Sequence, residues 1–75
     1  MIERVDIEVP SLSEEREAID IETALTGVTG IQRANADVQR HVVSIDYETD
    51  MIDRSYLERV ITKTGYPVKN GKDGQ

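Results

Sequence analysis

The sequence predicts an α+β domain of βαββαβ order, with two helices on one face of a four-stranded antiparallel sheet. Segments with the period of a strand and segments with the period of a helix follow one another in that order. Start and stop signals bracket both helical segments. The chain has 75 residues, which is enough for one core only. We therefore expect one domain over residues 1–69 and a flexible polar tail over residues 70–75.

The first strand is indicated by strict alternation between Arg4 and Val9. Val5, Ile7 and Val9 fall on one side of the chain and charged residues fall on the other, which is the pattern of a half-buried strand. Pro10 then ends the strand, because proline has no N–H to donate.

The first helix is predicted to start at Ser11–Glu14. A serine oxygen there can accept from an early free backbone N–H, while Glu14 reaches back in the manner of a capping box. Gly27 and Gly30 mark the end of the helix. The apolar stripe that follows the start consists of Ala18, Ile21, Leu25 and Val28.

Two further strands are predicted on either side of a hairpin turn at Asp37–Arg40. The second strand begins with an irregularity and the third alternates cleanly. The expected core positions are Ile31, Ala34, Ala36 and Val38 in the second strand, and Val43, Ile45 and Tyr47 in the third.

The second helix is predicted to begin at Asp53, which is a good N-cap residue, and to end before Gly65 in a left-handed conformation. Tyr66–Val68 is expected to form a short fourth strand. Pro67 cannot donate to a ladder, so this strand should lie at an edge or pair incompletely. The buried positions of the helix would be Leu57, Val60 and Ile61. The whole order is that of the ferredoxin-like sandwich.

Composition excludes several functions. The net charge of −6 disfavours nucleic acid, whose phosphates are held by clustered Lys and Arg. The absence of cysteine rules out disulfides, zinc fingers and thiol nucleophiles. No apolar run approaches the roughly 20 residues that span a bilayer, so we expect a cytoplasmic protein without direct membrane insertion. No nucleophile lies with a base and no Gly-rich phosphate loop occurs, so we expect neither an enzyme nor a cofactor.

From about Asp6 to Val68, the sequence resembles the heavy-metal-associated domains of copper chaperones and metal-transporting P-type ATPases. The positions that carry the resemblance are Val9-Pro10 ahead of the family's loop, Ile21, Leu25 and Val28 in the first helix, Gly30-Ile31 at the family's G-V pair, Asn35 to Val38, Val43 to Tyr47, and Thr64-Gly65-Tyr66. The resemblance implies the same fold and a link to metal-ion transport or trafficking.

The family's G-M-T-C-x-x-C loop falls on Ser11–Glu17 in this register. Leu12 takes the apolar position of the loop methionine, and Ser13 takes the capping position of its threonine. Both cysteine positions, however, are occupied by Glu14 and Glu17. Carboxylates are hard ligands, whereas the family's thiolates suit soft Cu(I) or Zn(II). The resemblance therefore implies a diverged member without the thiolate site.

The candidate site is a partner-contact loop. Its members are Ser11, Leu12, Ser13, Glu14, Glu17 and Tyr66. Glu14 and Glu17 are also weak candidates for holding a hard cation, since residues three apart share a helix face. The simpler interpretation is that these acids complement the positive end of the helix. His41, the only histidine, is expected to have an ordinary surface role at the end of the sheet.

We interpret the chain as a protein-contact or regulatory module of metal trafficking. Its partner would be a protein, such as a metal transporter or its soluble domain, and the chain itself a monomer or weak dimer. One alternative is an ACT-like regulatory domain that binds a small ligand, because ACT domains share the topology. Another is weak metal binding through carboxylates.

Overall fold

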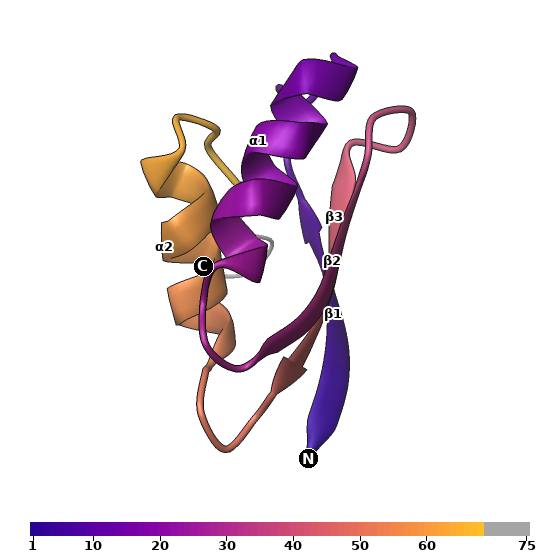
Figure 1. Ribbon diagram of the computed structural model, residues 1–75. Coiled ribbons are helices and arrows are strands. Elements are labelled where there is room, and N and C mark those ends of the chain that lie inside the picture. The colour runs from indigo at the N-terminus through magenta and orange to yellow at the C-terminus, as the bar shows by residue number, and fades with distance from the viewer. Residues whose placement is uncertain (69–75) are drawn as a thin grey trace, which may run out of the picture.

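The computed structural model describes residues 1–68 and is a layer of two helices on one side of an antiparallel sheet (Figure 1). Residue 69 and the predicted polar tail, residues 70–75, lie outside the described residues. The elements in chain order are β1 (Ile2–Glu8), α1 (Glu15–Thr26), β2 (Ile31–Asp37), β3 (Val42–Glu48) and α2 (Arg54–Lys63).

The sheet has the order β1-β3-β2, with both neighbours of β3 antiparallel to it. Val5 lies opposite Ile45 in the first pairing, and Ala34 lies opposite the same residue in the second. The β2–β3 register shifts between Ile31 and Arg33, which confirms the irregularity predicted at the start of that strand. The predicted turn at residues 37–40 is also present, because Asp37 Oδ1 accepts from two following backbone amides.

The prediction of a fourth strand is wrong for the described residues, which form a sheet of three strands. In Tyr66–Val68, Pro67 is exposed between two half-buried side chains that pack against the core. A strand also needs a ladder of hydrogen bonds, and in a segment this short the proline removes the central donor. The segment therefore packs on the core without forming the predicted strand.

The core lies between the helices and the sheet. The large side chains that are fully buried are those of Ile7, Val9, Leu12, Ile21, Leu25, Val43, Ile45, Leu57 and Ile61. Burial of each such aliphatic side chain contributes about 1.5–3 kcal/mol to folding before entropy is counted. The predicted stripe of α1 is confirmed at Ala18, Ile21 and Leu25, whereas Val28 lies beyond the helix and is half-buried.

The ends of α2 follow the prediction. Asp53 is its N-cap, and its carboxylate accepts from the backbone N–H of Tyr56 at 2.9 Å. After the helix, Gly65 has φ +102°, a left-handed conformation that favours glycine. Leu57 and Ile61 are fully buried as expected, while Val60 is half-buried.

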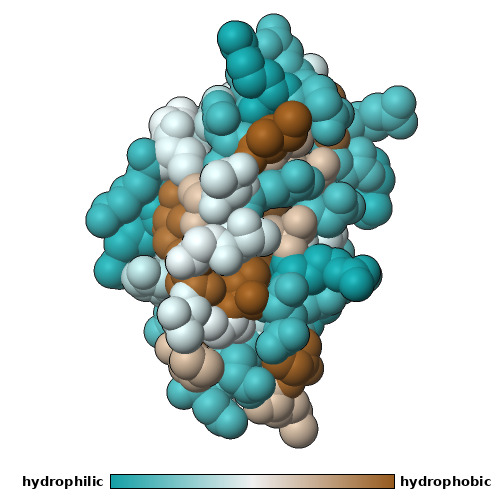
Figure 2. Space-filling model, in the orientation of Figure 1, coloured by the Kyte–Doolittle hydropathy of each residue, from teal (hydrophilic) through white to brown (hydrophobic). Residues whose placement is uncertain are grey.

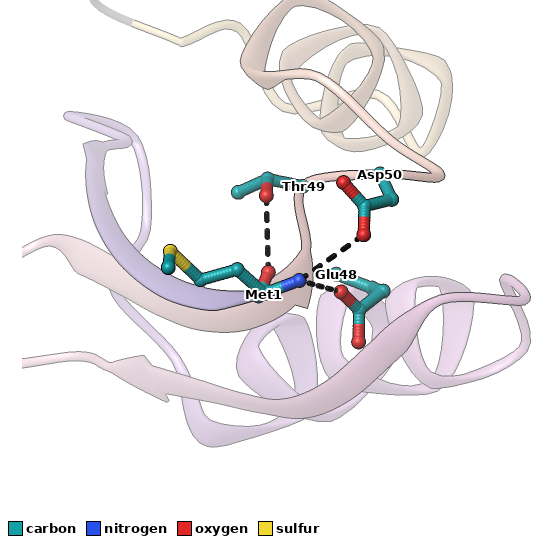
Figure 3. A network of polar contacts seen from close by, with 4 residues as sticks. All are labelled: Met1, Glu48, Thr49 and Asp50. Carbon is teal, nitrogen blue, oxygen red and sulfur yellow. Dashed lines mark hydrogen bonds and ion pairs between the residues drawn. The ribbon is translucent and has the colours of Figure 1, made fainter.

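The start of β1 is attached to the turn that follows β3 (Figure 3). The amino group of Met1 pairs with Glu48, and lies 3.3 Å from an oxygen of Asp50. The carbonyl of Met1 accepts from the backbone N–H of Thr49 at 2.8 Å and from its hydroxyl at 3.1 Å. The hydrogen bond to Glu48 is the main cause that raises the pKa of this amino group. The chain is thus held at the residue that precedes β1.

In the view of Figure 2, hydrophilic residues surround hydrophobic and intermediate residues that gather toward the middle of the molecule. The large apolar residues that remain exposed are Met1, Ile2, Ile19, Met51 and Tyr56. Over residues 1–68, neither helix is long and apolar enough to cross a membrane.

Candidate functional site

The segment between β1 and α1 is held in place by its own backbone and by the hairpin of β2 and β3. The N–H of Val9 donates to the carbonyl of His41 at 2.8 Å, and the N–H of Leu12 donates to the carbonyl of Val9 at 3.0 Å. The start of α1, this hairpin and the segment after α2 all lie at the upper end of the molecule in Figure 1. The residues of the candidate site therefore come together at one end of the fold.

Leu12 differs from the other candidates because its side chain is completely buried. It packs in the core, as the apolar position of the family's loop would require, and in this structure it offers no side chain to a partner. Ser11, Ser13 and Glu14 are exposed, and Glu17 is partly exposed. The loop is thus an exposed polar segment with one apolar anchor.

The cap of α1 lies later in the chain than the sequence indicated. The N-cap is Glu14, and Glu17 reaches back to it, so the capping box predicted at Ser11 and Glu14 is displaced by one helical turn. One carboxylate oxygen of Glu17 accepts from the N–H of Ser13 at 2.9 Å and from the N–H of Glu14 at 3.2 Å. The reason is positional: Glu17 is three residues after the true start of the helix, as a capping box requires.

The hydrogen bonds at Glu17 have an electrostatic consequence. The amide of Ser13 is the largest cause that lowers the pKa of this carboxyl, and the amide of Glu14 acts in the same direction. The hydroxyl of Ser13 also lies 3.4 Å from the same carboxylate oxygen. The carboxylate is therefore stabilised as an anion by the loop that it organises.

The two glutamates are not arranged as a ready cation site. Glu17 is engaged by the loop amides, and Glu14 lies 3.5 Å from the guanidinium of Arg16. Among residues 1–68, no group of three or more His, Asp or Glu side chains is placed to hold a metal ion. A cation between Glu14 and Glu17 would have to compete with the cap of the helix.

Tyr66 lies beside the exposed side of α1, as the candidate site requires. Its ring is half-buried against the core. Burial is the largest cause that raises the pKa of its hydroxyl, followed by the nearby carboxylates of Asp20 and Glu17. Tyr66 therefore stays a neutral phenol at the edge of the acidic helix start.

His41 is the residue that sequence reasoning undervalued. Its Nδ1 atom lies 2.6 Å from the carbonyl oxygen of Leu12, and its own carbonyl accepts from Val9. Its backbone has φ +57°, which is unusual for a residue with a side chain. The one available signal was its place at the end of the hairpin, opposite the end of the first strand. That signal does not reveal a side-chain contact.

A groove of about 630 Å³ lies at the other end of α1, away from the candidate loop. Its lining includes Val28, Met51, Ile52, Tyr56 and Arg59. None of the predicted site residues contributes to it. This groove and the candidate loop are thus separate features.

Comparison with protein families identifies a matching family. The family described as "Heavy-metal-associated domain" matches residues 7–67. This range lies within the segment from about Asp6 to Val68 on which the sequence resemblance rests. None of the curated protein sequences matches the chain.

Solved structures share the fold. The "CopZ metallochaperone" aligns with a TM-score of 0.86 and 22% identity, over 89% of this chain and 100% of its own. Oxidized MerP from Ralstonia metallidurans CH34 aligns with 0.86 and 15% identity, over 96% and 100%. The N-terminal domain of a potential copper-translocating P-type ATPase from Bacillus subtilis, solved in the Cu(I)-loaded state, aligns with 0.85 and 21% identity over 100% of both chains. At these identities the likeness establishes the fold.

Proposed function

This chain belongs to the heavy-metal-associated domain family, and on that premise we propose that it is a non-enzymatic protein-contact module of metal trafficking in the cytoplasm. It would dock through the end of the fold where relatives carry their metal loop, without holding a soft metal through thiolates. The chain has no cysteine, so the family's thiolate chemistry cannot occur at this loop.

The role of Glu17 carries the proposal. In the family register it stands at the second cysteine position, and here its carboxylate accepts from the amides of Ser13 and Glu14. At this position the relatives have a metal-binding cysteine, whereas the side chain of Glu17 stabilises the loop by hydrogen bonds to its backbone. The loop keeps an ordered shape although its metal chemistry is gone, and an ordered exposed loop is suited to recognition.

The contact surface would consist of exposed loop atoms beside a half-buried aromatic ring. Ser11, Ser13 and Glu14 supply polar groups, Glu17 supplies its second carboxylate oxygen, and Tyr66 supplies an amphipathic edge. Leu12 would contribute by anchoring the loop in the core. Such a small surface favours a transient contact over a permanent one.

The partner we propose is a soluble domain of a metal transporter. Structures with this fold include the metallochaperone and the P-type ATPase domain named above, so the fold occurs both in a chaperone and in a transporter domain. The present chain would occupy one side of such a contact as a regulator or decoy. The family assignment favours this interpretation over an ACT-like ligand-binding domain, and the engaged carboxylate of Glu17 disfavours carboxylate metal binding.

A binding titration tests the proposal directly. The ¹⁵N-labelled chain is titrated with the purified N-terminal metal-binding domain of a copper-transporting P-type ATPase. We expect amide shifts at residues 11–17 and around Tyr66, because these lie at the proposed contact end. Met51 and Tyr56, which line the groove at the other end of α1, should not respond.

A matched pair of charge reversals serves as the control. Glu14→Arg places a cation at the contact loop and should weaken binding several-fold. Glu3→Arg makes the same charge change on exposed β1, far along the strand from the loop, and should leave affinity unchanged. Equal loss with both variants, or shifts confined to the groove, would contradict the proposed surface.

A further inference from the structure

The outer edge of β2 carries a contact that the proposed function does not use. In the sheet order β1-β3-β2, β3 pairs with only one edge of β2. On the other edge, the backbone N–H of Ala36 donates to Oε2 of Glu22 at 2.8 Å. Glu22 belongs to α1, so a helix side chain occupies a donor that an additional strand would use.

The alternation of the strand identifies the other groups on this edge. Ala34 and Ala36 both lie on the face covered by the helices, two residues apart. Because the N–H of Ala36 is directed at Glu22, the N–H and C=O of Ala34 point toward the same edge. The edge from Arg33 to Asp37 thus has the spacing of donors and acceptors that an antiparallel partner requires.

This edge is complementary to itself. If a second copy pairs antiparallel with Asn35 opposite Asn35, Ala34 of each copy lies opposite Ala36 of the other. In the same register Arg33 of each copy lies opposite Asp37 of the other. Two-fold symmetry therefore gives two pairs of opposite charge at the contact. The side chains of the two alanines are too small to obstruct the approach.

We propose that the β2 edge is a pairing surface for a second copy of this chain, and that Glu22 closes it by binding the N–H of Ala36. A second copy fits better than an unrelated strand because the charges match under two-fold symmetry. The chain carries a net charge of −6, so two copies repel unless unlike charges are opposed at the contact. The register shift between Ile31 and Arg33 limits the pairing to residues 33–37.

Substitutions at Glu22 can remove or keep the hydrogen bond from the N–H of Ala36. Glu22→Ala and Glu22→Met both remove the acceptor, and methionine keeps the length and helix propensity of the side chain. We expect both variants to reach the mass of two chains in sedimentation velocity at millimolar concentration. Glu22→Gln keeps an oxygen that can accept from Ala36, so it should remain monomeric like the parent. This contrast separates the hydrogen bond from the charge.

The register is tested in the Glu22→Met background. Adding Arg33→Glu places like charges opposite each other twice, so the dimer should dissociate at least tenfold more readily. The Ala36 amide should be protected from hydrogen exchange in the parent by Glu22, and in the Glu22→Met dimer by the second copy. A monomeric Glu22→Met chain with a rapidly exchanging Ala36 amide would overturn the proposal. Rapid exchange at Ala36 in the parent would also overturn it, even if neither variant folded.

This inference does not depend on the proposed docking loop, because the β2 edge and the loop use different residues. Failure of the ATPase-domain titration would leave the edge proposal standing. Failure of the sedimentation experiment would leave the docking proposal standing.

Discussion

The Nδ1 atom of His41 lies 2.6 Å from the carbonyl oxygen of Leu12, which joins the β2–β3 hairpin to the loop before α1. The hydrogen bond from Val9 to the carbonyl of His41 runs in parallel with it. A single residue of the hairpin thus holds two points of the neighbouring segment. Leu12 is held from both sides, since its side chain is in the core.

Replacement of His41 by asparagine or alanine should loosen the loop while the domain stays folded. Both variants lose the ring that contacts Leu12, and asparagine tolerates the left-handed backbone better than alanine does. We expect faster hydrogen exchange at Leu12 in both variants, and a larger fall in the thermal midpoint for His41→Ala. Unchanged exchange at Leu12 would show that the core alone orders the loop.

Glu17 should make the stability of the domain sensitive to acid. Its pKa is lowered in the folded state from the ordinary value of 4.5, so its stabilising effect is complete above that value and is lost as the pH falls through the folded pKa. Glu17→Gln should therefore lower the thermal midpoint at neutral pH by a few degrees. The difference from the parent should shrink as the pH falls below the ordinary value of 4.5 and through the lowered folded-state pKa.

The control for this prediction is Glu15→Gln, another acid in the first turn of α1, with no capping role. It should change the midpoint less at neutral pH. Glutamine keeps an oxygen that can accept from the Ser13 and Glu14 amides, so this variant removes only the charge. A Glu17→Gln chain that matches the parent from neutral to acid pH would mean that the charge of Glu17 does not strengthen the capping contacts.

Gly65→Ala should lower the free energy of unfolding by about 1 kcal/mol. Gly65 has φ +102°, and a Cβ atom there would meet no atom within 4 Å among residues 1–68 other than its two chain neighbours, so the expected cost is that of the backbone. Gly27 has φ −79° at the end of α1 and serves as the matched control. Gly27→Ala should be neutral or stabilising, because alanine adopts that conformation without strain. Equal effects in urea unfolding would contradict the assigned left-handed cap.

The predictions from the sequence were most accurate for elements whose apolar residues follow a regular spacing and are buried in the single core. The alternation through Ile7 and Ile45, and the stripe through Ile21 and Leu25, report burial on one face, which the fold then realises. The cap of α1 was misplaced because Ser11 and Glu14 have the same spacing as Glu14 and Glu17, so the pattern fits two starts. In the folded chain the helix begins at the later of these two starts, with Glu14 as its N-cap.

Contacts between side chains of distant segments could not be predicted from the sequence. The bond from Ala36 to Glu22 and the contact of His41 with Leu12 depend on how α1 and the hairpin sit against their neighbours. No periodicity encodes them. The fourth strand failed for a related reason: side-chain burial at Tyr66 and Val68 is local, whereas pairing needs donors that Pro67 cannot supply.

Removal of metal should leave the domain folded. Its core is closed by aliphatic side chains from both helices and all three strands, and none of the core contacts requires a bound ion. We expect the same far-ultraviolet circular dichroism and the same thermal midpoint before and after dialysis against a strong chelator. A lower midpoint that is restored by one added metal would reveal a structural ion.

The family register itself can be tested by restoring the thiols. If Glu14 and Glu17 occupy the two cysteine positions, Glu14→Cys with Glu17→Cys should place two thiols at the start of α1, where the helix end lowers the thiol pKa. The parent should bind Cu(I) negligibly, and the double variant should bind it tightly, because two soft ligands then converge in an ordered loop. Each single variant should bind far more weakly.

The control for the register is Ser11→Cys with Glu14→Cys, which has the same spacing one turn earlier. Ser11 precedes the buried Leu12 and lies outside α1, so its thiol would not share the helix end with a thiol at Glu14. This variant also keeps the carboxylate of Glu17 that accepts from the loop amides, so weak binding could not be blamed on a lost cap. Competition against a Cu(I) indicator under reducing conditions ranks the variants. Equal affinity of the two double variants would mean that any paired thiols suffice, and the assigned register would lose its support.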